Sequence, residues 1–176
     1  MKKNKKWIQL AIFSVVLVIG VLTIISNLSA TSDKKYPQVG DKAPDFTLLD
    51  LNGQPHNLSD FKGKNILINF WGTFCKPCKD EMPALQRQYE KWNEQGVVFL
   101  AVNMDTSEIT VQSFMDQYNL NLPVLLDSKE QVRKNYGVMD YPSTFFIGKD
   151  GKIVIKKIGE MKETYIQETI QALVSK

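Results

Sequence analysis

The sequence contains few of the residues that cross-link small folds or bind metals, with two cysteines and one histidine among 176 residues. Two cysteines are too few for a small fold held together by several disulfides. The balance of 43% hydrophobic and 23% charged residues argues against disorder. No repeat or low-complexity tract follows residue 41, which excludes collagen-like proteins. Length and composition therefore fit one globular domain with a short additional segment.

A strong charge of one sign is also missing from most of the chain. The formal net charge is +3, but four of the 22 Lys and Arg residues lie within residues 2–6. Without these four, 18 positive residues face 19 negative ones, and the remainder carries a net charge of −1. A nearly neutral body gives no electrostatic reason to expect nucleic-acid binding.

One long hydrophobic run is present near the N-terminus. No charged residue occurs between Trp7 and Ser32, and residues 7–25 are almost wholly apolar. A helix over this run would rise about 28 Å, close to the roughly 30 Å of a hydrocarbon core. The basic cluster before the run favours a cytoplasmic N-terminus. We therefore expect a cytoplasmic segment at 1–6, an uncleaved single-pass anchor in the cell membrane at 7–29, a linker at 30–40 and an extracytoplasmic domain at 41–176.

A cleaved signal peptide is the main alternative for this run. Its apolar region usually spans about 7–15 residues and ends at a small-x-small site. The run here is longer, and cleavage after Ala30 would place Leu28 where a small residue is expected. A helix buried in a protein core is a third alternative. Either of the first two interpretations exports the chain that follows Ser32.

The exported part alternates between strand and helix patterns. Asn52-Gly53 is a strong hairpin dipeptide, and the near-continuous apolar run at 65–71 is typical of a strand covered on both faces. The expected strands are 46–51, 56–58, 65–71, 97–102, 124–126, 144–147 and 153–158, the last two joined across Asp150-Gly151. The expected helices begin near residue 75, cover 111–118, open with a capping box at 128–131 and end near 137, and cover 166–174. This alternation predicts an α/β domain with a mixed sheet flanked by helices.

The two cysteines form a Cys75-Lys76-Pro77-Cys78 motif between a buried strand and a helix. A thiol at a helix N-terminus faces unpaired backbone N–H groups and the positive end of the helix dipole, which favour the thiolate. Cys75 is therefore expected to be the exposed nucleophile, and Cys78, one turn into the helix, the less accessible resolving thiol. Pro77 suits the first turn, where its missing N–H costs nothing.

Other uses of a cysteine pair are less well supported. A disulfide that closes so short a loop stabilises a fold weakly. Zinc needs four ligands, and His56 is the one other soft ligand. Haem attachment requires a histidine after the second cysteine, where Lys79 stands. A Cu(I) site remains as an alternative. Redox chemistry at Cys75 and Cys78, with no metal or organic cofactor, is the preferred interpretation.

The sequence WGTFCKPC followed by KDEMPAL, with YPSTFFI some 67 residues after Cys75, resembles the thioredoxin superfamily. The pattern WGTxCxPCxxExP is more narrowly similar to the membrane-anchored, extracytoplasmic thiol–disulfide oxidoreductases of the ResA type, which are related to the TlpA and CcmG groups. The similarity extends from the basic N-terminus to the final helix. It implies a thioredoxin-like fold with an N-terminal β-hairpin and a central strand–helix insertion.

The resemblance also assigns individual residues. Cys75 and Cys78 match the redox-active disulfide, and Pro142 matches the cis-proline that places backbone beside the active sulfurs for a substrate strand. Tyr141 and Trp71 are expected to contribute to the substrate-binding rim, although a packing role for Trp71 is equally consistent with the sequence. Glu81 matches a glutamate near the active site. Three residues beyond Cys78 on a helix, it can share a face with that thiol and transfer its proton, unless it lies on a solvated face.

Three positions depart from related patterns. Thioredoxins often carry a buried aspartate six residues before the first cysteine, where this chain has Asn69. Phe74 replaces a tryptophan common in the subgroup, and Lys76 stands where ResA-type proteins often have glutamate. Thr73 is expected at the rim of the site. A cation at Lys76 should favour the Cys75 thiolate and weakens any expectation of identical substrates.

The resemblance implies a reductant of disulfides in exported proteins, with apocytochrome c before haem attachment as the first expected substrate. Its electrons would come from a membrane thiol transporter of the CcdA type. Reduction of other exported targets, as in the sporulation branch, and a disulfide oxidase remain open, because exported compartments are generally oxidising. A peroxiredoxin-like peroxidase would require proline at Ile68, and a copper chaperone would use a wider cysteine spacing.

Overall fold

The computed structural model describes residues 3–30 and 36–175 and divides the chain into two units, the second of which begins at Tyr36. The first contains helix α1 (Lys3–Ala30), which is long and apolar enough over Trp7–Ile24 to cross a membrane. None of that window is buried within the described chain. A membrane anchor and a signal sequence both fit these properties.

The folded domain begins earlier than the sequence suggested. Residues 31–35 of the linker expected at 30–40 lie outside the described residues. Residues 36–40 belong to the domain, because the Gly40 N–H donates to the Ile153 carbonyl at 2.8 Å and Pro37 is buried. The domain boundary expected at Asp41 is therefore wrong by five residues, since the preceding main chain already pairs with the sheet.

The domain is built on one seven-stranded mixed sheet in the order β2-β1-β5-β4-β3-β6-β7. The strands are β1 (Thr47–Asp50), β2 (Pro55–Asn57), β3 (Ile66–Trp71), β4 (Val98–Asn103), β5 (Val124–Leu126), β6 (Ser143–Ile147) and β7 (Ile153–Ile158). Strands β3, β4 and β5 are parallel, whereas β6 runs antiparallel to β3 and pairs with β7 in a hairpin. The predicted N-terminal hairpin is β1–β2, and β5 belongs to the predicted insertion between β4 and β6.

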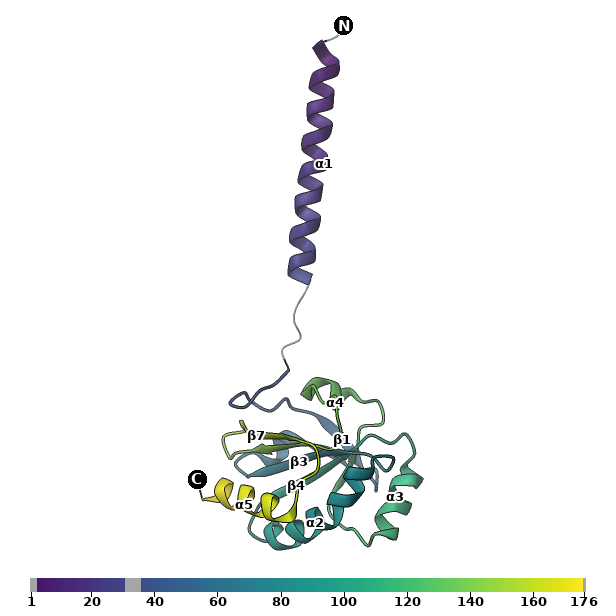
Figure 1. Ribbon diagram of the computed structural model, residues 1–176, viewed down its shortest axis with the longest axis vertical. Helices are drawn as coiled ribbons and strands as arrows, with labels where there is room; N and C mark the ends of the chain where they lie inside the picture. Colours follow the sequence, from purple (N-terminus) through teal and green to yellow (C-terminus); the bar gives the residue numbers. More distant parts are fainter. Residues whose placement is uncertain (1–2, 31–35, 176) are drawn as a thin grey trace. The chain divides into compact units, whose positions relative to one another are not determined.

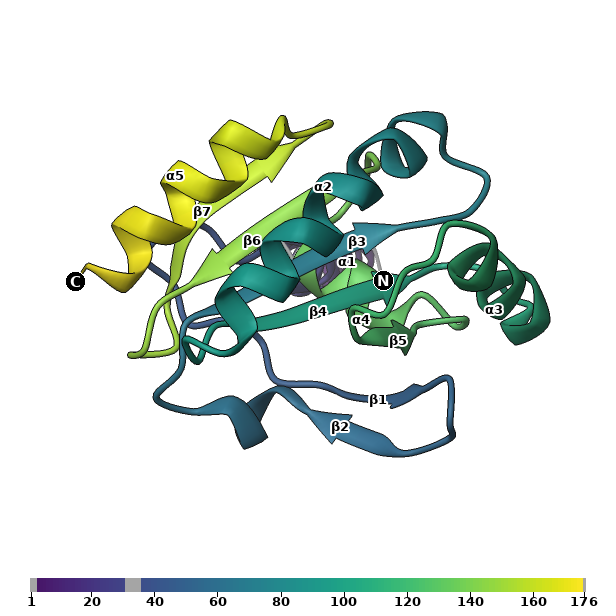
Figure 2. The same cartoon turned by 90° about the horizontal axis from the view of Figure 1, so that it is seen from below.

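Helices cover both faces of this sheet (Figures 1 and 2). They are η1 (Leu58–Phe61), α2 (Lys76–Asn93), α3 (Glu108–Gln117), α4 (Gln131–Tyr136) and α5 (Glu163–Val174). Helices α2 and α5 lie on one face and α4 on the other. Strand β3 is buried along its whole length, as its continuous apolar run predicts.

The alternation of side chains along β3 separates two hydrophobic clusters. Leu67 and Trp71 belong to the cluster that includes residues of α2 and α5, whereas Ile66, Ile68 and Phe70 belong to the cluster on the opposite face. Because side chains of a strand alternate between faces, Asn69 is placed on the α2 side. A polar residue at this one position of the strand therefore faces the helix that begins after Cys75.

The start of α4 differs from the sequence expectation. The predicted capping box beginning at Ser128 does not form, and Glu130 precedes the helix in a left-handed conformation with φ 55°. The carboxylate of Asp127 instead accepts from the N–H groups of Gln131 at 2.9 Å and Arg133 at 2.8 Å. A buried aspartate one residue earlier satisfies the free amides, so Ser128 is not needed as the cap.

Candidate active site

The motif lies at the edge of the sheet where β3 and β4 end. These strands are parallel neighbours with Trp71 opposite Asn103, so the loops that follow them emerge together. The first loop carries Cys75, which is the N-cap of α2. The Cys75 sulfur accepts a hydrogen bond from the Cys78 N–H at 3.2 Å, an orphan donor of the first helical turn.

Cys75 and Cys78 are joined by a disulfide bond, and the two sulfurs differ in accessibility. Cys75 is only 9% exposed, less than the exposed nucleophile expected from the sequence, whereas Cys78 is fully buried. An incoming group can therefore reach the first cysteine more readily than the second. This asymmetry fits the roles expected for an attacking and a resolving thiol.

An aromatic contact connects the cysteine loop to the segment before β6. Phe74 is 64% exposed, and its ring meets that of Tyr141 edge-on at a centroid distance of 6.0 Å. The Tyr141–Pro142 peptide bond is cis, as the resemblance implied. The structure thus brings the predicted substrate-binding pair, Tyr141 and Pro142, to the loop that carries Cys75.

Trp71 does not lie on this rim. Its side chain is fully buried and packs against Phe114, with ring centroids 5.1 Å apart. Of the two roles consistent with the sequence, the structure supports packing, because a ring without exposed surface cannot contact a substrate directly. The expectation of a substrate-binding Trp71 is corrected accordingly.

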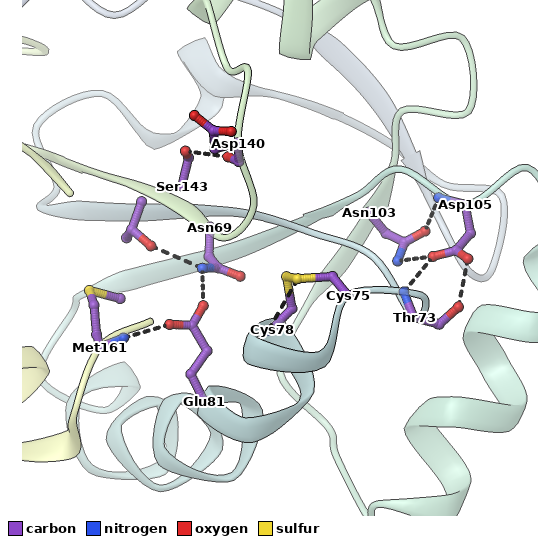
Figure 3. The surroundings of a disulfide bond; sticks show 11 residues. Asn69, Thr73, Cys75, Cys78, Glu81, Asn103, Asp105, Asp140, Ser143 and Met161 are labelled. Atoms are coloured by element: carbon purple, nitrogen blue, oxygen red, sulfur yellow. Dashed lines mark hydrogen bonds between the residues drawn. A yellow bond between two sulfur atoms is a disulfide. The ribbon is translucent and has the colours of Figure 1, made fainter. Parts of the chain in front are cut away.

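Glu81 is buried beside β3 rather than solvated on the outer face of α2. Its side chain is 1% exposed, and both carboxylate oxygens accept hydrogen bonds (Figure 3). Asn69 Nδ2 donates to Oε1 at 2.8 Å, and the Met161 N–H donates to Oε2 at 2.9 Å. The first of these donors comes from the central strand and the second from the segment before α5.

This environment makes the carboxyl group of Glu81 a weaker acid than an exposed glutamate. Burial raises the pKa of its carboxyl group to about 7, although the hydrogen bonds from Met161 and Asn69 act in the opposite direction. The charge of Glu160 raises the pKa further, and that of Lys157 lowers it. A carboxyl group with a pKa near neutrality can both accept and release a proton at physiological pH.

Lys76 is paired with a carboxylate on the surface of α2. Its ammonium lies 2.6 Å from Asp80, and both side chains are exposed. The hydrogen bond and charge of Asp80 raise the pKa of Lys76. The cation expected to favour the Cys75 thiolate is therefore accompanied by a negative charge one turn away, which reduces its effect.

An aspartate that sequence reasoning missed connects the two loops at this edge. Asp105 accepts from the Thr73 N–H at 2.8 Å and from the Thr73 hydroxyl at 2.6 Å (Figure 3). Buried Asn103 donates its amide to the same carboxylate at 2.9 Å and accepts from the Asp105 N–H. Asp105 thereby fixes the segment directly before Cys75. The one sequence signal was its position just after a buried strand.

The described residues contain no group of three or more His, Cys, Asp or Glu side chains arranged to hold a metal ion. The single histidine, His56, instead pairs with Asp50 at 3.0 Å within the β1–β2 hairpin. The reactive groups that the described site brings together are the two sulfurs of Cys75 and Cys78 and the carboxyl group of Glu81. A redox-active cysteine pair at the start of a helix, on a mixed sheet of this topology, defines the thioredoxin-like thiol–disulfide oxidoreductases.

Comparison with known proteins supports this class. The model of the AhpC/TSA family matches residues 39–156. Thiol-disulfide oxidoreductase ResA of Bacillus subtilis is 41% identical over 167 residues, which cover 95% of this chain and 92% of that protein. ResA of Bacillus cereus is 38% identical over 173 residues, which cover 98% and 99% of the two chains.

Solved structures show the same fold. A putative thiol:disulfide interchange protein DsbE from Chlorobium tepidum aligns with a TM-score of 0.74 and 30% identity, over 78% of this chain and 99% of the other. StoA from Bacillus subtilis aligns with a TM-score of 0.64 and 28% identity, over 72% and 96%. The chain belongs to the AhpC/TSA family, and within it to the ResA-type thiol–disulfide oxidoreductases.

Proposed function

We propose that this protein is a membrane-anchored, extracytoplasmic reductant of disulfides in exported proteins. Apocytochrome c, before haem attachment, is the substrate that the ResA resemblance favours. In this proposal α1 is an uncleaved anchor whose basic N-terminus stays in the cytoplasm, and the domain from Tyr36 onward acts on the outer face of the membrane. A membrane thiol transporter of the CcdA type would return electrons to the oxidised site.

The first chemical step belongs to Cys75. In the reduced protein its thiolate attacks one sulfur of the partner disulfide, forms a mixed disulfide and displaces the other partner sulfur as a thiolate. The exposed fraction of Cys75 and its position at the N-terminus of α2 support this assignment. The cis Tyr141–Pro142 segment, linked to the cysteine loop through Phe74, is the proposed docking edge for the partner backbone.

The second step is the main support for the proposal, because this step needs the buried carboxyl group of Glu81. Cys78 is shielded from solvent, so its proton needs an acceptor inside the protein. Glu81 lies one helical turn away, and a pKa of about 7 allows it to take that proton. The Cys78 thiolate then attacks Cys75 in the mixed disulfide, restores the Cys75–Cys78 bond and releases the second partner sulfur.

A redox titration of the full-length protein in detergent against thiol buffers tests the direction of the reaction. Reference potentials are about −270 mV for thioredoxin and about −120 mV for the oxidant DsbA. A potential below about −230 mV supports a reductant, whereas one near −120 mV identifies an oxidase. Absence of a reversible two-electron couple, with tight Cu(I) binding, would favour a copper-binding module instead.

A second candidate function is reduction of an exported protein other than apocytochrome c. The Lys76–Asp80 pair is the observation that supports it. This pair places a cation beside Cys75 where ResA-type proteins often have an acid, so a partner of different charge could be preferred. A competition experiment distinguishes the two candidate substrates. It compares reduction of an oxidised CxxCH haem-attachment peptide with reduction of a disulfide peptide that lacks the histidine. Preferential reduction of the first supports apocytochrome c, and equal or reversed rates support another target.

A further inference from the structure

Asn69 lies at the centre of the contacts around Glu81. It sits on β3 directly opposite Thr144 of β6, and its side chain is 1% exposed. Both hydrogens of its amide nitrogen are used, one by Glu81 Oε1 at 2.8 Å and the other by Thr144 Oγ1 at 2.9 Å. The orientation of the amide is therefore fixed by two acceptors on two different elements.

The carbonyl oxygen of the same amide has no hydrogen-bond partner among residues 3–30 and 36–175. A buried acceptor without a donor is unfavourable, so such a group in a native protein calls for an explanation, and a redox or catalytic role is one of those known. In Figure 3 the Asn69 amide lies above the Glu81 carboxylate, and its carbonyl oxygen points to the side on which the disulfide is drawn. The structure holds the oxidised protein, in which neither sulfur carries a proton.

Reduction of the Cys75–Cys78 disulfide creates a hydrogen-bond donor, the Cys78 S–H group, on the sulfur side of Asn69. Opening the Cys75–Cys78 bond consumes two electrons and two protons from a donor dithiol, and one proton ends on Cys78 as a thiol. Because Cys78 is fully buried, water cannot easily satisfy its S–H group. The thiol and the Glu81 side chain leave the same helix three residues apart and so share a face.

We infer that Asn69 is a positioning residue for the exchange reaction. Its N–H groups hold the Glu81 carboxylate, and its carbonyl oxygen accepts the Cys78 S–H once the disulfide opens. This arrangement would keep the thiol beside the carboxylate that receives its proton. The inference rests on the proposed role of Glu81 and adds a residue that no catalytic motif marks, at the position where thioredoxins often carry an aspartate.

The other charges acting on Glu81 must be separated from the effect of Asn69. Glu160 and Lys157 act on the carboxylate with opposite signs, and the Met161 N–H binds its second oxygen. None of these is altered when Asn69 is replaced. Loss of the Asn69 N–H donor destabilises the charged form of Glu81, so its pKa rises.

The test is a double-mutant cycle on the full-length protein, read as the pH profile of single-turnover reduction of a model disulfide. Asn69→Ala is expected to move the inflection that reports Glu81 upward by about one pH unit. In Glu81→Gln that inflection is absent, and adding Asn69→Ala is expected to change the profile no further. Thr144→Val, a nearly isosteric change, should give a smaller upward shift and keeps the test available if Asn69→Ala folds poorly.

Asn65 provides a matched control, because it is a second buried asparagine adjoining the same strand and donates to Leu173 O at the opposite end. Asn65→Ala should lower stability without moving the inflection. An unmoved inflection in both Asn69→Ala and Thr144→Val, or multiplicative losses in the double variant, would overturn the inference. If the inflection persists in Glu81→Gln, the proposed role of Glu81 itself fails, and the two failures are distinguishable.

A separate measurement tests whether the carbonyl oxygen of Asn69 accepts a hydrogen bond from the Cys78 S–H group. In a Cys75→Ser background, Cys78 is the only thiol, and its S–H stretching band can be recorded by infrared spectroscopy. With Asn69 present, the band should lie at the lower frequency of a hydrogen-bonded thiol. Asn69→Ala should shift it upward, and an unchanged band would remove Asn69 as the acceptor.

Discussion

The amide of Asn69 donates a 2.8 Å hydrogen bond to the carboxylate of Glu81, joining the central strand to the helix that carries both cysteines. This contact places a carboxyl group from α2 beside a strand position where thioredoxins often have an aspartate. In the proposed mechanism the proton acceptor therefore lies on the helix, and the strand residue donates a hydrogen bond to it.

Replacing Glu81 by glutamine should slow release of the reduced partner more than formation of the mixed disulfide. Glutamine keeps the size of the side chain but cannot accept the Cys78 proton, and a lost general base typically costs about 10²–10⁴-fold in rate. Rapid-quench alkylation at neutral pH should therefore trap the mixed disulfide on Cys75. Equal slowing of both steps would contradict this role.

Stability should depend on pH through Glu81. Its pKa is about 7 in the folded protein and 4.5 as the unperturbed value, so the folded state binds more protons between these limits. Stability from this group is full below about pH 4.5, falls as the pH rises toward 7, and is then constant, a loss of roughly 3 kcal/mol. Urea unfolding of the oxidised protein should show this loss in the wild type and not in Glu81→Gln. Parallel curves for the two proteins would show that Glu81 titrates normally.

The two thiols of the reduced protein should react at different rates. Cys75 lies at a helix N-terminus and keeps 9% of its surface exposed, whereas Cys78 is fully buried. Because a helix N-terminus favours a thiolate, we expect alkylation of Cys75 at neutral pH to be at least about tenfold faster than that of Cys78. Mass spectrometry of partially alkylated protein measures the ratio directly, and similar labelling of both cysteines would undo the assignment of nucleophile and resolving thiol.

Asp105→Ala should loosen the loop that precedes Cys75. It removes two hydrogen bonds to Thr73, and we expect a loss of roughly 2 kcal/mol in unfolding free energy together with slower exchange. Hydrogen exchange at the Thr73 amide should accelerate. Asp116→Ala is a suitable control, because Asp116 accepts from Gln112 on the exposed surface of α3. An equal effect of both changes on the exchange rate would mean that Asp105 does not position the site.

Lys76→Gln should affect redox chemistry more than folding. Exposed ion pairs contribute little to folding, so stability should change little, while loss of the cation should reduce the fraction of reduced Cys75 present as thiolate. Arg87→Gln breaks another exposed pair, with Glu163, and serves as the matched control. A pH titration of thiolate absorbance in the reduced proteins distinguishes them. Identical curves for all three proteins would leave Lys76 without influence on Cys75.

The strands of the sheet, the helix after Cys75 and the residues of the redox pair could be predicted from local sequence patterns. Period-two and period-3.6 hydrophobic patterns reflect burial of local segments, and the cysteine motif is continuous in the chain, so neither requires knowledge of distant contacts. The same holds for α1, whose length and apolar composition are local properties. Local pattern failed at the start of α4, where buried Asp127 replaced the expected cap.

The surroundings of the cysteines depend on contacts between segments that are distant in the sequence. Asn69 meets Glu81 across 12 positions of sequence, Thr73 meets Asp105 across 32, and the Met161 N–H reaches Glu81 across 80. Trp71 was assigned to the core in the same way, because its exposure depends on Phe114 packing over it. Burial and hydrogen bonding from distant segments set the pKa of Glu81, and these arise only when β3, α2 and the segment before α5 are packed together.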